Sequence, residues 1–176
     1  MLWGALTSAF FGLLRSSEFS SPTSSSVSPA TLLLSHLSFA AGFSAATLFL
    51  PFSKTDQFGC GVHVSLFPLP SPLCPVSALR HYLAARSPSP GPLFLFADGS
   101  FLTRADIVVL LRRAFPAEPS LNTHSFRIGG ASALAAAGVP AYVIQTLGRW
   151  SSDSFLRYLR TSAPSLRSYQ RRMLGS

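Results

Sequence analysis

Acidic residues and lysine are scarce in this sequence. Six Asp and Glu stand against fourteen Lys and Arg, thirteen of which are Arg, so the formal net charge is +8. Such an excess predicts a polyanionic partner, either a nucleic acid or an anionic membrane surface, although GC-biased coding would also enrich Arg. The distribution favours a nucleic acid, because six arginines gather toward the C-terminus around a single acid, Asp153: Arg149, Arg157, Arg160, Arg167, Arg171 and Arg172.

Cysteine and histidine are also too few for some classes of protein. The two cysteines, Cys60 and Cys74, cannot form a disulfide framework, and the four histidines are not at the spacings of metal ligands. The apolar start of the chain, Met1 to Leu14, lacks the basic residues and the cleavage site of a signal peptide. We therefore expect an intracellular protein in a reducing compartment, not secreted and without a metal site.

Formal charge is absent between Glu18 and Lys54. Within this interval residues 30–52 are long and apolar enough to span a bilayer as a helix. The segment also contains several Ser and Thr, a glycine and a proline, and it alternates polar and apolar residues at Thr47–Leu50. We therefore predict buried strands there. A membrane-associated protein anchored by residues 30–52 is the alternative.

Apolar periodicity and turn residues predict a mostly helical chain with one sheet near its N-terminal third. The expected helices are Leu2–Leu14, Pro75 to about Ala85, a segment up to Phe115 that begins at a capping box of Thr103 and Asp106, a small-residue helix from His124, a short helix ending near Gly148, and Pro164 to about Met173. The expected strands are Leu32–Phe39, Ala46–Phe52 and Gly61–Phe67. With 176 residues the chain can form one domain of the mixed α/β class, mainly α, with helices around a small three-stranded antiparallel sheet.

The stretch from residue 122 to residue 160 carries most of the side chains that could act together in catalysis. His124 and Arg127 are three residues apart at the start of an expected helix, which places an imidazole and a guanidinium on one helical face. Tyr158 follows, flanked by arginines. A phenol can attack a phosphodiester once nearby positive charge lowers its pKa from about 10, and arginines can hold the phosphate oxygens. Gly129 and Gly130, inside the same expected helix, predict close helix packing.

Four short segments extend this pattern over nearly the whole chain. They are GLLRSSEF at 12–19, SKTDQFG at 53–59, HSFRIGGAS at 124–132 and LGRWSSDSFLRYLR at 147–160. In this order they resemble the arginine box, the lysine-bearing hairpin, the H-x-x-R box and the nucleophile segment of the tyrosine recombinase (phage integrase) family. The second and fourth segments look closest to recombinases of eukaryotic mobile elements, the DIRS-like and Crypton groups. The resemblance implies the tyrosine recombinase catalytic-domain fold over residues 1–176.

The resemblance also implies a reaction, DNA strand cleavage and rejoining in site-specific recombination. By likeness to the family, Tyr158 would attack the scissile phosphate and form a 3′-phosphotyrosyl link with release of a 5′-hydroxyl. Arg15 and Arg127 would bind the non-bridging oxygens, and Lys54, the only lysine of the chain, would give a proton to the leaving oxygen. No metal and no cofactor is implied, because the phosphotyrosine keeps the energy of the bond.

Further site positions follow from the same resemblance. His124 matches a position that assists proton transfer and contacts phosphate, and Glu18 matches an acidic position that supports the site. The family has His or Trp after the glycine, nine residues before the tyrosine, where this chain has Arg149. Either Trp150 fills that place with a shift of one residue, or Arg149 supplies a third cation there. Taken singly, these side chains also have structural explanations, such as helix capping for His124 and core packing for Tyr158.

The implied partner is double-stranded DNA, which Arg157 and Arg160 would contact, and the implied assembly is a homo-oligomer on DNA, a synaptic tetramer. The implied location is the nucleus. Family members carry a core-binding (clamp) domain ahead of the catalytic domain, whereas the first motif of this sequence begins close to Met1. We therefore expect an N-terminally clipped catalytic domain without a clamp domain on this chain. A non-catalytic DNA-binding remnant or domesticated fragment of a mobile-element recombinase is the alternative function.

Overall fold

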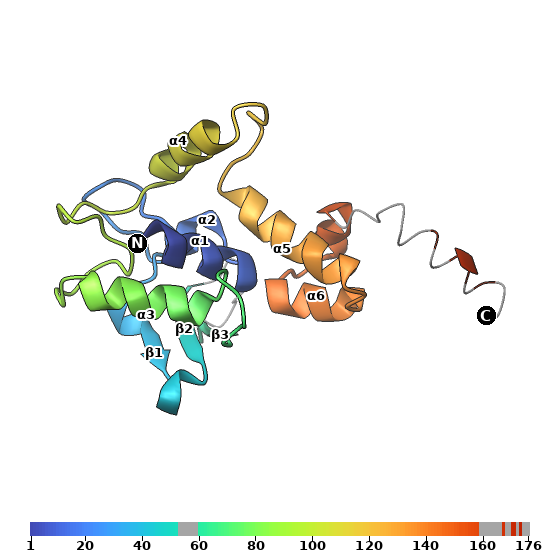
Figure 1. Ribbon diagram of the computed structural model, residues 1–176, viewed down its shortest axis with the longest axis horizontal. Coiled ribbons are helices and arrows are strands. Elements are labelled where there is room, and N and C mark those ends of the chain that lie inside the picture. Colours follow the sequence, from blue (N-terminus) through green and yellow to red (C-terminus); the bar gives the residue numbers. More distant parts are fainter. Residues whose placement is uncertain (53–59, 159–166, 168–169, 172, 174–176) are drawn as a thin grey trace.

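The computed structural model describes residues 1–52, 60–158, 167, 170–171 and 173. In these residues six α-helices accompany a three-stranded antiparallel sheet, which confirms the predicted mixed α/β, mainly α class (Figure 1). The helices are α1 (Leu2–Phe11), α2 (Ser16–Phe19), α3 (Pro75–Ala85), α4 (Arg104–Ala114), α5 (His124–Ala136) and α6 (Ala141–Gly148). Three short 3₁₀ helices are η1 (Leu34–His36), η2 (Ala41–Phe43) and η3 (Asp153–Tyr158).

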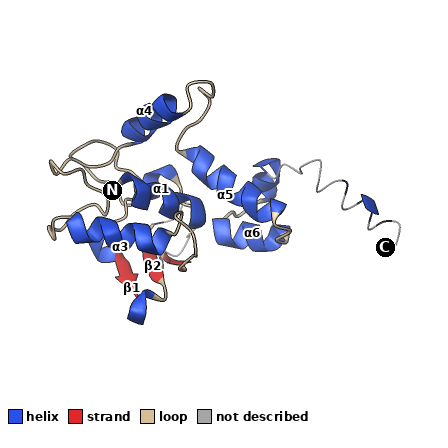
Figure 2. Ribbon diagram, in the orientation of Figure 1, coloured by secondary structure: helices blue, strands red, loops and turns tan. Residues whose placement is uncertain are grey.

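The sheet has the strand order β1 (Leu37–Phe39), β2 (Ala46–Leu50) and β3 (Val62–Leu66). Figure 2 shows the strands gathered at one end of the molecule beside α3. Alternate residues of β2 are buried, so one face of the strand packs on the core. No helix in the described part of the chain is long and apolar enough to cross a membrane, and the segment considered as a span contains β1 and β2 instead.

The first strand is shorter than predicted. Its expected N-terminal half, from Leu32, contains the 3₁₀ helix η1 instead. The reason is a local hydrogen bond that competes with strand pairing: the backbone N–H of Leu33 donates to Nδ1 of His36 over 3.2 Å. Such a bond closes a turn, and pairing with β2 begins only at Leu37, opposite Leu48.

Two of the predicted helices begin at the capping residues that the sequence indicated. Pro75 occupies the first position of α3, where its missing N–H is harmless. In α4 the hydroxyl of Thr103 accepts a hydrogen bond from the Asp106 N–H over 3.3 Å, while the Asp106 carboxylate accepts from the Thr103 N–H over 2.9 Å. The first helix instead stops at Phe11, before the predicted Leu14. The chain then turns through a positive φ of 47° at Leu13.

Helix α1 packs against both α3 and α5 (Figure 1). The approach to α5 is close, because a Cβ added at Gly130 would lie 2.5 Å from the carbonyl oxygen of Phe10. This contact confirms the predicted close helix packing at Gly130. It holds α5, which begins at His124, beside the C-terminal turn of α1.

The buried apolar residues form two separate clusters. The larger core joins α1, the sheet, α3 and α4. The smaller core consists of Ala131, Ile144 and Phe155, from α5, α6 and η3, with Trp150 and three other apolar residues packed against it. Helix α5 belongs to both, since Phe126 packs against the larger cluster and Ala131 lies in the smaller one.

Candidate active site

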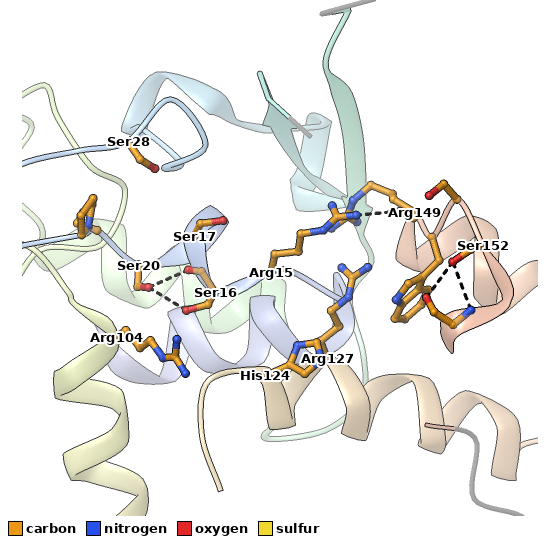
Figure 3. Close-up of a pocket in the computed structure, with 15 residues that line it drawn as sticks. Arg15, Ser16, Ser17, Ser20, Ser28, Arg104, His124, Arg127, Arg149 and Ser152 are labelled. Atoms are coloured by element: carbon orange, nitrogen blue, oxygen red, sulfur yellow. Dashed lines mark hydrogen bonds between the residues drawn. The ribbon is translucent and has the colours of Figure 1, made fainter. Parts of the chain in front are cut away.

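A cavity of about 790 Å³ opens where the starts of α2, α4 and α5 meet the segment after α6 (Figure 3). Four arginines, one histidine, one tryptophan, one proline and eight serines line it: Arg15, Ser16, Ser17, Ser20, Ser21, Pro22, Ser28, Arg104, His124, Arg127, Arg149, Trp150, Ser151, Ser152 and Ser154. Among these described lining residues there is no Asp or Glu. The cavity is therefore a strongly cationic site rimmed by hydroxyl groups, which suits an anionic ligand.

Arg15 occupies the N-cap position of α2 in an extended conformation, with φ −76° and ψ 153°. Its backbone N–H and its Nη1 both donate to the carboxylate of Glu18, over 2.7 Å and 3.0 Å. Glu18 is only 1% exposed, whereas the Arg15 side chain is 23% exposed. The buried carboxylate therefore orients a guanidinium that still reaches the cavity.

Arg149 follows α6 in the left-handed conformation, with φ 59° and ψ 42°. Its Nη2 donates to the second oxygen of the Glu18 carboxylate over 2.8 Å, and its guanidinium also donates to the carbonyl oxygens of Gly12 and Leu13, each over 3.2 Å. Burial lowers the pKa of Arg149, and the adjacent Glu18 carboxylate opposes that effect. Nη2 of Arg15 donates in turn to the Arg149 carbonyl oxygen over 2.9 Å. Two cations thus share one buried carboxylate.

Arg127 is the most deeply buried of the cavity arginines, with 2% of its surface exposed. Its two terminal nitrogens donate to the backbone carbonyl oxygens of Leu13 and Gly148. Its Cζ lies 4.1 Å from the centre of the Trp150 ring, within the range of a cation–π interaction. The carbonyl oxygen of Leu13 therefore accepts hydrogen bonds from both Arg127 and Arg149. These contacts bring guanidiniums from α5 and from the end of α6 to the turn after α1.

Trp150 and Arg149 occupy different places, although both line the cavity. The indole of Trp150 stacks on Phe155, with ring centres 5.5 Å apart and an interplanar angle of 29°. It lies so close to Gly148 that a Cβ added there would be 1.6 Å from the ring. Arg149 turns instead toward Glu18. Trp150 therefore packs against Phe155, whereas Arg149 places a positive charge beside Glu18. These are the two residues that the sequence offered for the position nine residues before the tyrosine.

His124 is the first residue of α5, and its backbone N–H donates to Oδ1 of Asn122 over 2.9 Å. Burial lowers the pKa of its imidazole, and the positive charges of Arg127 and Arg104 lower it further. The imidazole is therefore held neutral at pH 7, the form that can accept a proton. His124 and Arg127 meet in one cavity, as their spacing predicts.

Arg104 was not among the residues singled out from the sequence. It is the first residue of α4 and lines the same cavity from the side opposite Arg149 (Figure 3). A bridge between Ser21 and Thr103, with the Ser21 N–H donating to the Leu102 carbonyl oxygen over 2.8 Å, places it there. Because this contact joins distant parts of the chain, no local sequence pattern marks Arg104.

Several predicted site residues cannot be placed in the cavity. Lys54 and Arg160 lie outside the described residues, as does most of the expected helix from Pro164 to Met173. Arg157 and Tyr158 end η3, and the description there covers the backbone. The structure brings together six of the predicted site residues: Arg15, Glu18, His124, Arg127, Arg149 and Trp150.

No protein-family model and no curated protein matches this sequence. Solved structures do resemble it. The XerH site-specific recombinase bound to a palindromic difH substrate, in a post-cleavage complex, aligns with a TM-score of 0.68 and 18% identity, over 95% of this chain and 44% of that one. The XerA recombinase aligns with a TM-score of 0.67 and 16% identity, over 98% and 56%.

A Flpe–DNA Holliday junction complex aligns with a TM-score of 0.56 and 13% identity, over 96% of this chain and 40% of that one. The chain thus spans about half the length of the structures it resembles. The part of these recombinases that it matches is the catalytic domain. In its architecture, this chain has the fold of a tyrosine recombinase catalytic domain.

Proposed function

We propose that this protein cleaves and rejoins DNA strands in site-specific recombination, through a 3′-phosphotyrosyl intermediate on Tyr158. The observation that carries the proposal is the cavity in which Arg15, Arg127 and Arg149 converge beside His124. A tyrosine recombinase catalytic fold surrounds that cavity, and the motif at 147–160 supplies the tyrosine. Double-stranded DNA is the substrate that this combination fits.

The charge of the site matches a phosphodiester. Three guanidiniums carry three positive charges, and Glu18 offsets one of them, which leaves a net charge of +2. A phosphodiester carries one negative charge, and more negative charge gathers on its non-bridging oxygens as the nucleophile adds. Fixed cations around such a group stabilise the transition state more than the ground state. The arginines are held by backbone carbonyls and a carboxylate, so little reorganisation is needed during the reaction.

The reaction balances without a cofactor. The phenolic oxygen of Tyr158 bonds to phosphorus as the bond from phosphorus to the 5′ oxygen breaks. The phenol loses its proton, which the neutral imidazole of His124 is suited to accept, and Lys54 gives a proton to the departing 5′ oxygen. Attack by the 5′-hydroxyl of a second strand reverses these steps and frees the tyrosine.

Other members of this fold family have one residue, His or Trp, at the position after the glycine, whereas here Arg149 and Trp150 each supply part of its function. Arg149 carries the charge, because it is paired with Glu18 at the edge of the cavity. Trp150 carries the packing, because it contacts both Arg127 and Phe155. The pairing favours a third cation at this position over a simple shift by one residue.

The wider setting rests on the sequence segments. SKTDQFG and GRWSSDSFLRY favour a recombinase of a eukaryotic mobile element, DIRS-like or Crypton, acting in the nucleus. Arg157 and Arg160 flank Tyr158 and would contact the DNA backbone. Assembly as a homo-oligomer on DNA follows from the same resemblance, because recombination joins strands from two sites.

A suicide DNA substrate, nicked so that the cleaved end diffuses away, tests the proposal. Wild-type protein should form a denaturant-resistant covalent adduct, and Tyr158→Phe should not. Tyr142→Phe is a matched control, because Tyr142 is 70% exposed on α6 and does not line the cavity. An adduct that survives Tyr158→Phe would contradict the assignment. The catalytic proposal also fails if the wild type forms no adduct, alone or fused to a DNA clamp domain.

A non-catalytic DNA-binding module is the second candidate, because the arginine cavity does not depend on Tyr158 to attract DNA. This function predicts salt-dependent binding with little sequence preference, equal in the wild type and in Tyr158→Phe, and no adduct from either. A binding assay run beside the adduct assay separates the two functions.

A further inference from the structure

We infer that Phe155 is a positioning residue for Tyr158, and that it acts through the three-residue stack formed by Arg127, Trp150 and Phe155. The inference rests on the proposed function, because it concerns how the nucleophile is delivered to the phosphate site. Neither sequence motif nor fold resemblance assigns a role to Phe155. Its importance comes from contacts within the small core.

The stack connects the phosphate site to the segment that carries the nucleophile. Arg127, from α5, lies with its Cζ 4.1 Å from the centre of the Trp150 ring. Trp150 in turn stacks on Phe155, with ring centres 5.5 Å apart. Cation–π contacts and stacked rings both stabilise the positions of the side chains that form them. A continuous path of contacts therefore runs from a cavity arginine to η3.

Phe155 is also the anchor of η3. Phe155 is 1% exposed, whereas Leu156 is 47% exposed. Asp153 is exposed and Ser154 is partly buried, so Phe155 is the one fully buried residue among the η3 side chains that the structure describes. Tyr158 lies three residues, one 3₁₀ turn, beyond Phe155 in the chain. The position of the tyrosine backbone therefore depends on how Phe155 is seated.

Trp150 and Arg127, the other two members of the stack, are held in place by neighbouring groups. A Cβ added at Gly148 would lie 1.6 Å from the Trp150 ring, so the indole lies directly against the α6 terminus. Arg127 is held by the carbonyl oxygens of Leu13 and Gly148. Phe155 thus packs on a ring whose own position is set by α5 and α6.

This arrangement predicts an effect on rate rather than on DNA affinity. The cavity arginines come from α2, α4, α5 and the end of α6, and none of them belongs to η3. Truncating Phe155 would leave them in place while freeing the segment that ends in Tyr158. A displacement of a reacting group by about 1 Å is enough to lower a rate by about 100-fold.

Single-turnover cleavage of the suicide substrate at saturating DNA tests this. Phe155→Ala should form the adduct about 100-fold more slowly than the wild type, with a DNA Kd changed by less than about twofold. Phe155→Leu keeps apolar volume and should lie between the two. Leu156→Ala, the adjacent exposed residue, is the matched control and should match the wild type. A loss of affinity equal to the loss of rate, or equal rates for all four proteins, would overturn the inference.

A double-mutant cycle tests whether the residues act as a stack. Trp150→Ala and Phe155→Ala should each slow the reaction, and the double variant should be no more than about threefold slower than the slower single variant. Rate losses that multiply would show that the residues act independently. Phe155→Leu and Trp150→Phe provide a second cycle if an alanine variant fails to fold.

Amide hydrogen exchange gives a measure that does not need activity. In Phe155→Ala the amides of residues 153–158 should exchange at least about tenfold faster than in the wild type, while those of α3 should not change. Leu156→Ala should leave residues 153–158 unchanged. Faster exchange in Phe155→Ala, together with a wild type that never forms an adduct, would support the anchor and reject the proposed function. Unchanged exchange in Phe155→Ala would reject the anchor, whatever the activity.

Discussion

Glu18 is the acidic residue on which the charge balance of the site depends. Its buried carboxylate accepts hydrogen bonds from Arg15 and Arg149, which lie far apart in the sequence. A buried ion pair contributes little net stability compared with an apolar replacement, but removing one partner leaves an uncompensated charge. The consequence at the residue scale is that Glu18 contributes to folding as well as to the arrangement of the cavity arginines.

Replacing Glu18 by Ala should therefore lower the free energy of unfolding by about 3–5 kcal/mol. The physical cause is the Arg149 guanidinium, which is 7% exposed and would lose its carboxylate partner. Urea denaturation measures the change. Glu118→Ala removes an exposed acid of the same type and should change the free energy of unfolding by less than about 0.5 kcal/mol. Equal stability of the two variants would contradict the role of Glu18.

The pKa of His124 is lowered, first by burial and then by Arg127 and Arg104, from a usual value of 6.5. The unfolded chain therefore binds a proton at a pH where the folded chain does not. Stability should fall as the pH drops below about 6.5 and should continue to fall down to the lowered pKa. Thermal melting between pH 5 and 7.5 should show this slope, with a shallower slope in His124→Gln. His36, whose pKa burial also lowers, contributes in the same direction, so His36→Gln is measured in parallel.

The three-residue spacing of His124 and Arg127 in one helix was enough to predict from the sequence alone that the two side chains lie together. The partner of Glu18 was not predictable in the same way, because Arg149 is 131 residues away and the contact depends on how α6 ends. Arg104 enters the cavity through a loop-to-loop bridge, and Phe155 gains its place from a separate core. Local patterns carry no information on such contacts.

The α1–α5 contact makes a prediction at the scale of elements, because two adjacent glycines of α5 differ in their surroundings. A Cβ at Gly130 would lie 2.5 Å from the backbone oxygen of Phe10, whereas at Gly129 the nearest atom is a Phe10 ring carbon at 3.4 Å. Gly130→Ala should force α5 away from α1 and destabilise the protein by about 1–3 kcal/mol.

Gly129→Ala is the matched control, since it adds the same methyl group to the same helix. Alanine is the better helix former, so the change should be neutral or should stabilise by up to about 1 kcal/mol. Differential scanning calorimetry compares the two. Equal losses of stability would mean that α1 and α5 do not approach as closely as described.

The starts of two helices were predicted correctly because a particular side chain fixes each of them. Pro75 and the pair of Thr103 and Asp106 predicted the starts of α3 and α4 correctly. The first strand was predicted too long, because its N-terminal half contains a 3₁₀ turn that His36 closes by accepting a hydrogen bond from the Leu33 N–H. The sequence alone does not decide between a backbone ladder and such a local hydrogen bond.

The whole molecule carries a net charge of +8, and four arginines concentrate part of it in one cavity. Binding to duplex DNA should therefore weaken steeply with salt, because each phosphate contact releases counterions. Arg104→Ala should reduce the slope of log K against log salt by about 0.9, the value for one phosphate contact. Arg113→Ala, at the other end of α4 and outside the cavity, is the control. Equal slopes for the Arg104 variant and the wild type would exclude a phosphate contact by Arg104.

The unequal size of the two cores has a consequence for the working temperature of the protein. The larger core holds α1, α3, α4 and the sheet, whereas three fully buried residues anchor α5, α6 and η3 to one another. Segments with few buried apolar contacts open at lower free energy than the rest of a protein. On warming, the region around Tyr158 should open while most of the chain remains folded. The proposed cleavage activity would then be lost reversibly below the melting temperature. A melting curve dominated by the larger core would overstate the temperature range of that activity.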